Sequence, residues 1–200
     1  MPEGKRPIAI FQAALLVLDM QSYFLEPGSH AFVPSAQAIL PGILSLIEGF
    51  SNQKLPVIFS QHVNTPENAG SMGTWWADLI QVGDPSSAII PQLKEKVKLL
   101  IQKNQYDAFF QTTLNSLLHH NRVSQVVICG VMTHLCCETT ARSAFMHGFE
   151  VFFPVDGSAT YNLAFHQAAL LNLAHGFATI TTVAEILKLL NEPHEQAITD

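Results

Sequence analysis

Three side chains of this sequence could share one reaction: Asp19, Lys103 and Cys136. A carboxylate can accept and return a proton, and an ammonium group can stabilise a neighbouring anion. A cysteine thiolate is a strong nucleophile toward carbonyl carbon. Each of the three lies at, or a few residues beyond, the end of an apolar run. If Cys136 is a nucleophile, the chain is a cysteine hydrolase.

Cys136 has the most informative surroundings. It lies between a predicted buried strand at 125–129 and a predicted helix at 136–147. A sulfur at such a turn lies near the positive end of a helix dipole, which favours the thiolate. We therefore expect an activated thiol at Cys136. The other two cysteines, Cys129 and Cys137, are expected to be buried packing residues.

The elements that must position these side chains alternate between apolar, β-rich runs and helical patterns. Strands are predicted at 13–18, 56–62, 98–102, 125–129, 150–154 and 177–181. Helices are predicted at 35–51, 112–121, 136–147, 163–175 and 183–190. This alternation predicts an α/β fold, a three-layer α/β/α, Rossmann-like domain with a central, mostly parallel sheet of about six strands. Ligands bind such sheets at the carboxyl ends of the strands, and Asp19, Lys103 and Cys136 all fall at that edge.

A chain of 200 residues suits a single domain. We expect one domain over residues 1–200, with a core at about 12–190 and a polar C-terminal tail after Asn191. Two stretches, 25–34 and 64–91, lack a regular pattern. Loops of that length in a compact domain are often functional.

Composition excludes several classes of protein. Apolar residues make up 48% and charged residues 13%, which excludes a disordered chain. The net charge is −6 and no basic patch occurs, so no nucleic-acid partner is expected. No segment is long and apolar enough to span a bilayer, so no membrane association is expected.

The N-terminal run from Lys5 to Leu18 superficially resembles a signal peptide, but Gln12 interrupts it and Asp19 ends it. We therefore do not expect cleavage. The three cysteines cluster in one segment and do not resemble a secreted disulfide framework. A cytoplasmic location is predicted.

Three blocks of sequence carry a family resemblance. The blocks are Leu16-Val17-Leu18-Asp19-Met20-Gln21 with Phe24; Lys103 with Tyr106-Asp107-Ala108-Phe109 and Thr112-Thr113-Leu114; and Gly130-Val131-Met132-Thr133 with Cys136, Thr140-Ala141 and Ala144. In order and spacing they resemble the isochorismatase-like cysteine hydrolases. That family includes nicotinamidases, N-carbamoylsarcosine amidases and isochorismatases, and the resemblance covers most of the chain.

The resemblance implies a catalytic triad of Asp19, Lys103 and Cys136. Asp19 would accept the thiol proton and pass it to the leaving group, and Cys136 would form a thioester that water cleaves. The backbone N–H groups of Met132 and Cys136 would form the oxyanion hole, and a cis peptide would precede Met132. Relatives form dimers or tetramers, so a homodimer or homotetramer is expected.

Five residues are predicted to contact a small-molecule substrate: Phe24, Trp75, Trp76, Val131 and His134. Aromatic walls would suit a small, flat or apolar amide. The sequence leaves open whether the two tryptophans form a lid or a subunit interface. It also leaves open whether His134 contacts substrate or is only a loop residue.

The sequence departs from nicotinamidases at their metal site. Those relatives carry an Asp-x-His-x-x-His pattern after the second strand, where this chain has Phe59-Ser60-Gln61-His62-Val63-Asn64-Thr65. A single histidine cannot hold a divalent ion without other ligands. We therefore expect no metal and no cofactor, and nicotinamide becomes a less expected substrate.

Three functions remain open at this point. The first is a metal-independent hydrolase of a linear amide or ureido C–N bond. The second is an isochorismatase-type vinyl-ether hydrolase in which Asp19 is the acid and Cys136 is dispensable. The third is a non-catalytic or redox-responsive module on the same fold, in which Cys136 and Cys137 would respond to oxidants.

Overall fold

The computed structural model describes residues 8–76 and 78–192, and its centre is a seven-stranded sheet. The strands are β1 (Ala13–Leu18), β2 (Val57–His62), β3 (Leu99–Lys103), β4 (Gln125–Val131), β5 (Glu150–Pro154), β6 (Ser158–Ala159) and β7 (Ala178–Thr181). Their order is β3-β2-β1-β4-β5-β7, with β6 beside β4, and every pair is parallel. This confirms the predicted fold. Most of the predicted polar tail, 193–200, lies outside the described residues.

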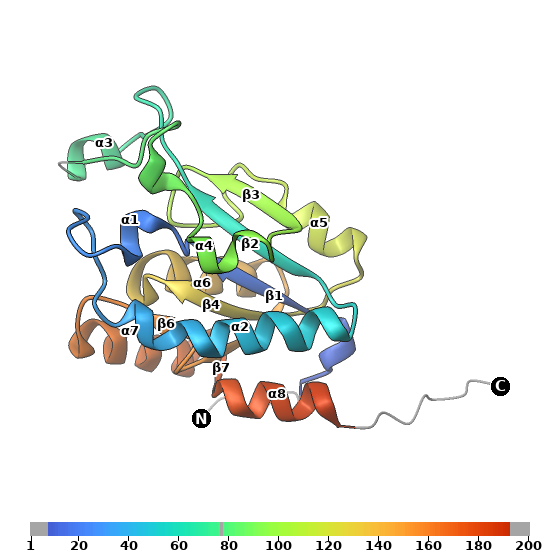
Figure 1. Ribbon diagram of the computed structural model, residues 1–200. Helices are drawn as coiled ribbons and strands as arrows, with labels where there is room; N and C mark the ends of the chain where they lie inside the picture. Colours follow the sequence, from blue (N-terminus) through green and yellow to red (C-terminus); the bar gives the residue numbers. More distant parts are fainter. Residues whose placement is uncertain (1–7, 77, 193–200) are drawn as a thin grey trace.

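Helices cover both faces of the sheet (Figure 1). The helices are α1 (Ser22–Leu25), α2 (Ala36–Asn52), α3 (Met72–Trp75), α4 (Pro91–Lys94), α5 (Leu114–His120), α6 (Glu138–Met146), α7 (Leu163–Gly176) and α8 (Val183–Asn191). Single turns also occur: η1 (Ile10–Gln12), η2 (Pro85–Ser87) and the π-helical turn η3 (Thr133–Cys137). Helices α2 and α8 pack on one face, and α5, α6 and α7 pack on the other. No helix in the described ranges is both long and apolar enough to cross a membrane.

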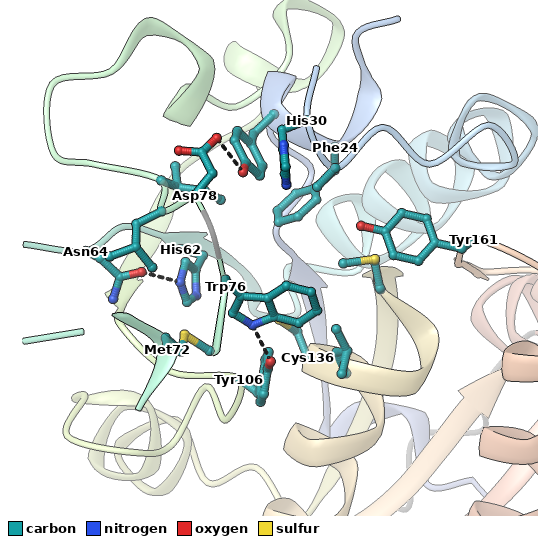
Figure 2. A pocket seen from close by; sticks show the side chains of 16 residues that line it. Phe24, His30, His62, Asn64, Met72, Trp76, Asp78, Tyr106, Cys136 and Tyr161 are labelled. Atoms are coloured by element: carbon teal, nitrogen blue, oxygen red, sulfur yellow. Dashed lines mark hydrogen bonds between the residues drawn. The ribbon is translucent and has the colours of Figure 1, made fainter. Parts of the chain in front are cut away.

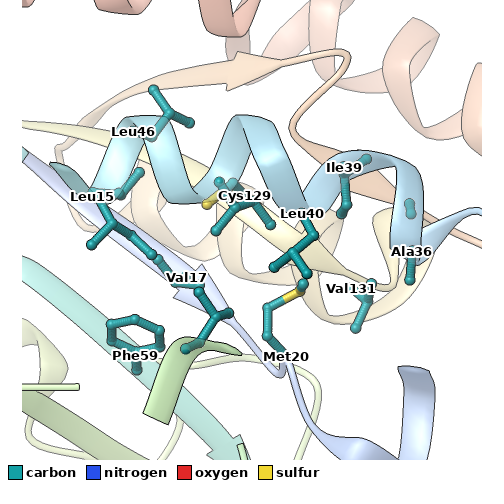
Figure 3. Packing of buried hydrophobic residues seen from close by; sticks show 14 of the residues in the cluster. Leu15, Val17, Met20, Ala36, Ile39, Leu40, Leu46, Phe59, Cys129 and Val131 are labelled. Carbon is teal, nitrogen blue, oxygen red and sulfur yellow. The ribbon is translucent and has the colours of Figure 1, made fainter. Parts of the chain in front are cut away.

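The central strand β1 is buried on both faces, which explains its uninterrupted apolar sequence. Leu15 and Val17 pack beneath α2 together with Cys129 of β4 (Figure 3). Leu16 and Leu18 point to the opposite face and join the cluster under α5 and α6. The alternation of side chains along a strand therefore divides the core into two layers around the sheet.

Gly130 lies where β4 passes closest to the end of β1. Its φ is +116°, and a Cβ at this position would lie 2.1 Å from the carbonyl oxygen of Leu18. Gly130→Ala should therefore lower the free energy of unfolding by about 2–5 kcal/mol, measured by urea denaturation. Gly28→Ala is the matched control, because Gly28 has a φ of +91° but nothing within 4 Å of the added methyl group. Equal losses in the two variants would contradict a steric cause.

The boundaries near Cys136 differ from those predicted. Strand β4 continues to Val131, and Cys136 lies in η3 rather than at the start of α6. The peptide bond between Val131 and Met132 is cis, as the resemblance implied. Hydrophobic periodicity detects the strand and the helix but not the single turn that joins them.

Candidate active site

The sheet brings the predicted triad to one edge, at the carboxyl ends of its strands. Asp19 follows β1 directly and has a positive φ of 51°, which turns the chain at this point. Lys103 is the last residue of β3, in register with His62 at the end of β2. Cys136 approaches from η3, just beyond β4. Residues far apart in sequence therefore meet because their strands run in the same direction.

The three side chains are in direct contact and almost fully buried. Lys103 Nζ lies 2.8 Å from Asp19 Oδ2 and 3.3 Å from Cys136 Sγ. The hydroxyl of Ser60 donates a hydrogen bond of 2.6 Å to Asp19 Oδ1, and this orients the carboxylate. The ammonium group thus joins the carboxylate to the sulfur.

Asp19 and Lys103 form a charged pair. Burial raises the pKa of the Asp19 carboxyl, but the charge of Lys103 and nearby hydrogen bonds lower it more, so the net pKa lies below the usual value. Burial lowers the pKa of the Lys103 ammonium, but the Asp19 carboxylate raises it more, so the net pKa lies above the usual value. Both groups therefore stay ionised at neutral pH.

The helix dipole was expected to favour the thiolate at Cys136, but the resting sulfur is a neutral thiol; its role as a nucleophile stays a prediction. Burial and the neighbouring Asp19 carboxylate raise the pKa of the Cys136 thiol to about 12, and Lys103 offsets them only in part. The helix-dipole argument failed because the sulfur is buried beside an anion and lies in η3 rather than at the first turn of α6. A nucleophilic attack would have to transfer the thiol proton to Asp19 as the sulfur reacts.

A cavity of about 90 Å³ opens beside Cys136 (Figure 2). Aromatic side chains form part of its walls, among them Phe24, Trp76, Tyr106 and Tyr161. Trp76 Nε1 donates a hydrogen bond of 2.7 Å to the Tyr106 hydroxyl, which ties the segment after α3 to the loop after β3. The cavity has room for one small molecule with a flat face against these rings.

Two of the five predicted substrate-contacting residues, Phe24 and Trp76, line the cavity, and so does Met132. Three lie elsewhere. Trp75, the last residue of α3, is 78% exposed, whereas Trp76 follows the helix in an extended conformation and lines the cavity. Val131 is buried beneath α2 (Figure 3). His134 stacks on Phe165 with a centroid distance of 4.4 Å, facing α7.

Several polar side chains at the cavity were not identified as site residues from the sequence. The hydroxyl of Tyr23 donates a hydrogen bond of 3.1 Å to Asp78, and His30 lies nearby. His62 and Asn64 face the cavity from the end of β2 and the residues just after it. The only sequence signal for Asn64 and Asp78 was their place in the irregular stretch 64–91.

The residues around His62 do not suit a metal ion. Its Nε2 lies 2.8 Å from Asn64 Oδ1, and its Nδ1 lies 3.3 Å from the ammonium of Lys103. Ser60, at the position of the aspartate in the metal-binding pattern, is engaged with Asp19. Among residues 8–76 and 78–192, no group of three or more His, Cys, Asp or Glu side chains could hold a metal. The residues of this site therefore do not fit the metal-binding pattern of nicotinamidases.

Comparison with known proteins gives consistent matches. The family model described as the isochorismatase domain matches residues 13–185. The chain is 39% identical over 183 residues to nicotinamidase 3 of Arabidopsis thaliana, covering 89% of this chain and 88% of that protein. A cysteine hydrolase from Pseudomonas syringae pv. phaseolicola 1448A superposes with a TM-score of 0.89 at 25% identity, covering 95% of this chain and 97% of that one. A Pyrococcus horikoshii pyrazinamidase in complex with zinc superposes with a TM-score of 0.75 at 28% identity. The superposition covers 86% of this chain and 99% of that one.

Proposed function

The chain belongs to the isochorismatase family of hydrolases, and on that premise we propose that it is a metal-independent cysteine hydrolase of a small amide or ureide. The observation that carries the proposal is the direct contact of Lys103 with both Asp19 and Cys136 beside the cavity. These are the groups that acyl transfer through a thioester requires.

The reaction would proceed in two halves. The Sγ of Cys136 attacks the carbonyl carbon while its proton passes to Asp19, and the carbonyl oxygen becomes an oxyanion. Asp19 returns the proton to the leaving nitrogen, the C–N bond breaks and a thioester remains. Water then attacks the thioester, giving up a proton to Asp19, which returns it to the departing sulfur. The backbone N–H groups of Met132 and Cys136 are proposed to hold the oxyanion, because both residues line the cavity.

The charge of the cavity favours an uncharged substrate. Among the described residues that line it, Asp78 is acidic and none is Arg or Lys. Burial and the charge of Lys103 lower the pKa of His62 to about 4, so its imidazole is neutral at pH 7. Isochorismate carries two carboxylates, which proteins bind with cationic side chains. Vinyl-ether hydrolysis of such a dianion is therefore the less supported alternative.

A redox-responsive role is also less supported. Oxidant sensing needs an exposed thiol of low pKa. Cys136 and Cys137 are both buried, and burial raises the pKa of each thiol above its usual value. The neighbouring sulfurs therefore give no sign of a sensing pair.

The substrate panel follows from the cavity and from the relatives. The missing metal pattern made nicotinamide a less expected substrate, but the aromatic side chains of the cavity suit a flat carboxamide and the relative at 39% identity is named nicotinamidase 3. Nicotinamide is therefore tested first, ahead of pyrazinamide. N-carbamoylsarcosine, suggested by a relative at 24% identity, carries a carboxylate and comes last. Ammonia release should be measured after dialysis against EDTA, and the acylated enzyme should be trapped by acid quench and located by peptide mass. We expect turnover that survives EDTA and an acyl adduct on Cys136. Loss of turnover in EDTA would contradict metal independence, and cleavage of isochorismate alone would favour ether hydrolysis.

Two further expectations stay predictions. A homodimer or homotetramer would cover apolar side chains that are exposed on α7 and at the end of α6, including Leu163, Leu171 and Met146. A cytoplasmic location suits a chain whose cysteines are all unpaired.

A further inference from the structure

The ammonium group of Lys103 is surrounded by more hydrogen-bond acceptors than it has N–H donors. It carries three N–H donors. Its two nearest acceptors are Asp19 Oδ2, an ion-pair contact at 2.8 Å, and the carbonyl oxygen of Gln105, which accepts a hydrogen bond of 2.9 Å. Two further acceptors lie at the same, longer distance of 3.3 Å, His62 Nδ1 and Cys136 Sγ. Four acceptors thus surround three N–H groups, and we infer from the distances that the two farther acceptors share one of them. The imidazole of His62 and the sulfur of Cys136 therefore compete for a hydrogen bond from one N–H of Lys103.

Asn64 fixes His62 as an acceptor in this competition. The Nδ2 of Asn64 donates to the carbonyl oxygen of Asn104 at 3.0 Å, and a carbonyl can only accept. This orientation turns Oδ1 of Asn64 toward His62 Nε2, 2.8 Å away, so Nε2 must carry the imidazole proton (Figure 2). The Nδ1 of the neutral ring is then left with a lone pair facing Lys103.

The backbone holds Asn64 in the position that this arrangement requires. Its N–H donates to the Ile80 carbonyl at 2.6 Å, and its carbonyl accepts from Val82 N–H at 3.1 Å. The two hydrogen bonds form a parallel bridge with Gln81 in the long loop. Asn64 is thus anchored independently of His62, and it can impose one tautomer on the ring.

We propose that His62, fixed by Asn64, is a positioning residue. At rest it accepts a hydrogen bond from the third N–H of Lys103, and this keeps Cys136 in its thiol form. A thiol is a weak hydrogen-bond acceptor, so in the resting site this N–H of Lys103 points to His62 Nδ1 rather than to Cys136 Sγ. A thiolate is a strong acceptor, and forming one requires that the hydrogen bond to His62 be given up. The histidine therefore restrains the nucleophile by making its ionisation more costly.

The proposal deepens the proposed function, because a restraint on Cys136 matters only if the sulfur reacts with substrate. The competition itself does not depend on the substrate. The charged groups that face His62 are Lys103 and, behind it, Asp19. Alkylation of Cys136 by iodoacetamide can therefore test the restraint even if the substrate class is wrong.

The first test compares His62→Leu with His62→Asn. Leucine removes the acceptor, whereas the side-chain oxygen of asparagine can replace Nδ1. We expect Cys136 in the leucine variant to be alkylated about three- to tenfold faster than in the unmodified protein at each pH from 6 to 9, since losing one competing hydrogen bond shifts the ionisation by that order. The asparagine variant should stay within about twofold of the unmodified protein, because its acceptor is retained. Adducts are assigned by peptide mass, and circular dichroism checks the fold.

The second test uses Asn64→Asp, which still accepts from His62 Nε2, loses the donor to the Asn104 carbonyl and adds a negative charge. That charge should raise the pKa of His62 by about one to three units. A protonated His62 has no lone pair for Lys103, so alkylation should accelerate at pH 5.5 and return to the unmodified rate by pH 8.5. Unchanged alkylation in His62→Leu, equal acceleration in His62→Asn, or an Asn64→Asp effect that does not vary with pH would each overturn the proposal.

Discussion

Replacing Cys136 with alanine should abolish amide hydrolysis while the protein stays folded. The substitution removes the atom that forms the thioester, so kcat/KM should fall about a thousandfold or more. The side chain is small and borders a cavity, so the loss of packing is modest. The measurement is ammonia release by the purified variant, with the urea midpoint as a check of folding.

Cys137→Ala is the matched control for this variant. It also deletes one buried sulfur, but Cys137 packs in the cluster beneath α6 and does not line the cavity. We expect a small loss of stability with turnover within about threefold of the unmodified protein. Substantial residual turnover in Cys136→Ala would contradict thioester chemistry and favour an ether hydrolase that uses Asp19 alone.

The fold was predictable from sequence because the central strands are buried on both faces. A short, uninterrupted apolar run such as Ala13–Leu18 is typical of a strand that is covered on both faces. The strands all run in parallel, so the residues that end β1 and β3 had to reach the same edge of the sheet. That constraint placed Asp19 and Lys103 before any contact was known.

The cavity was predictable only in part, because its walls come from segments without periodicity. Trp76 faces the site and its neighbour Trp75 does not, and this depends on where the short helix α3 ends. The pKa of the Cys136 thiol is raised, not lowered as the helix dipole suggested, because the sulfur is buried beside Asp19. No local sequence pattern encodes that contact. The partnership of His62 with Asn64 likewise depends on a bridge between distant parts of one loop.

In the resting site the charged groups are therefore Lys103 and Asp19, and Cys136 is not a thiolate. Lys103 and Asp19 hold opposite charges in a buried setting, while the adjacent thiol of Cys136 is neutral. Transfer of the thiol proton to Asp19 would then be coupled to attack of the sulfur on an electrophilic carbon. We therefore expect Asp19 to contribute both to turnover and to stability.

Asp19→Asn should remove activity and lower stability together. Asparagine has nearly the same shape as aspartate but cannot accept the thiol proton, so turnover should fall about a hundredfold or more. It also leaves the ammonium of Lys103 buried without its counter-ion, which should reduce the free energy of unfolding by about 3–5 kcal/mol at pH 7. Urea denaturation and ammonia release measure the two effects separately.

The double variant Asp19→Asn with Lys103→Met separates charge from packing. It removes the unpaired ammonium, so stability should recover to within about 2 kcal/mol of the unmodified protein while activity stays absent. The pKa of Asp19 is lower in the folded chain than in the unfolded chain, so the stabilisation by the pair is present above the unfolded pKa and is lost as pH falls through the folded pKa. The stability gap between the unmodified protein and Asp19→Asn should accordingly be full at pH 7 and narrow in acid. A single variant as stable as the unmodified protein, or a gap that does not change with acid, would show that Asp19 and Lys103 are not ionised together in the fold.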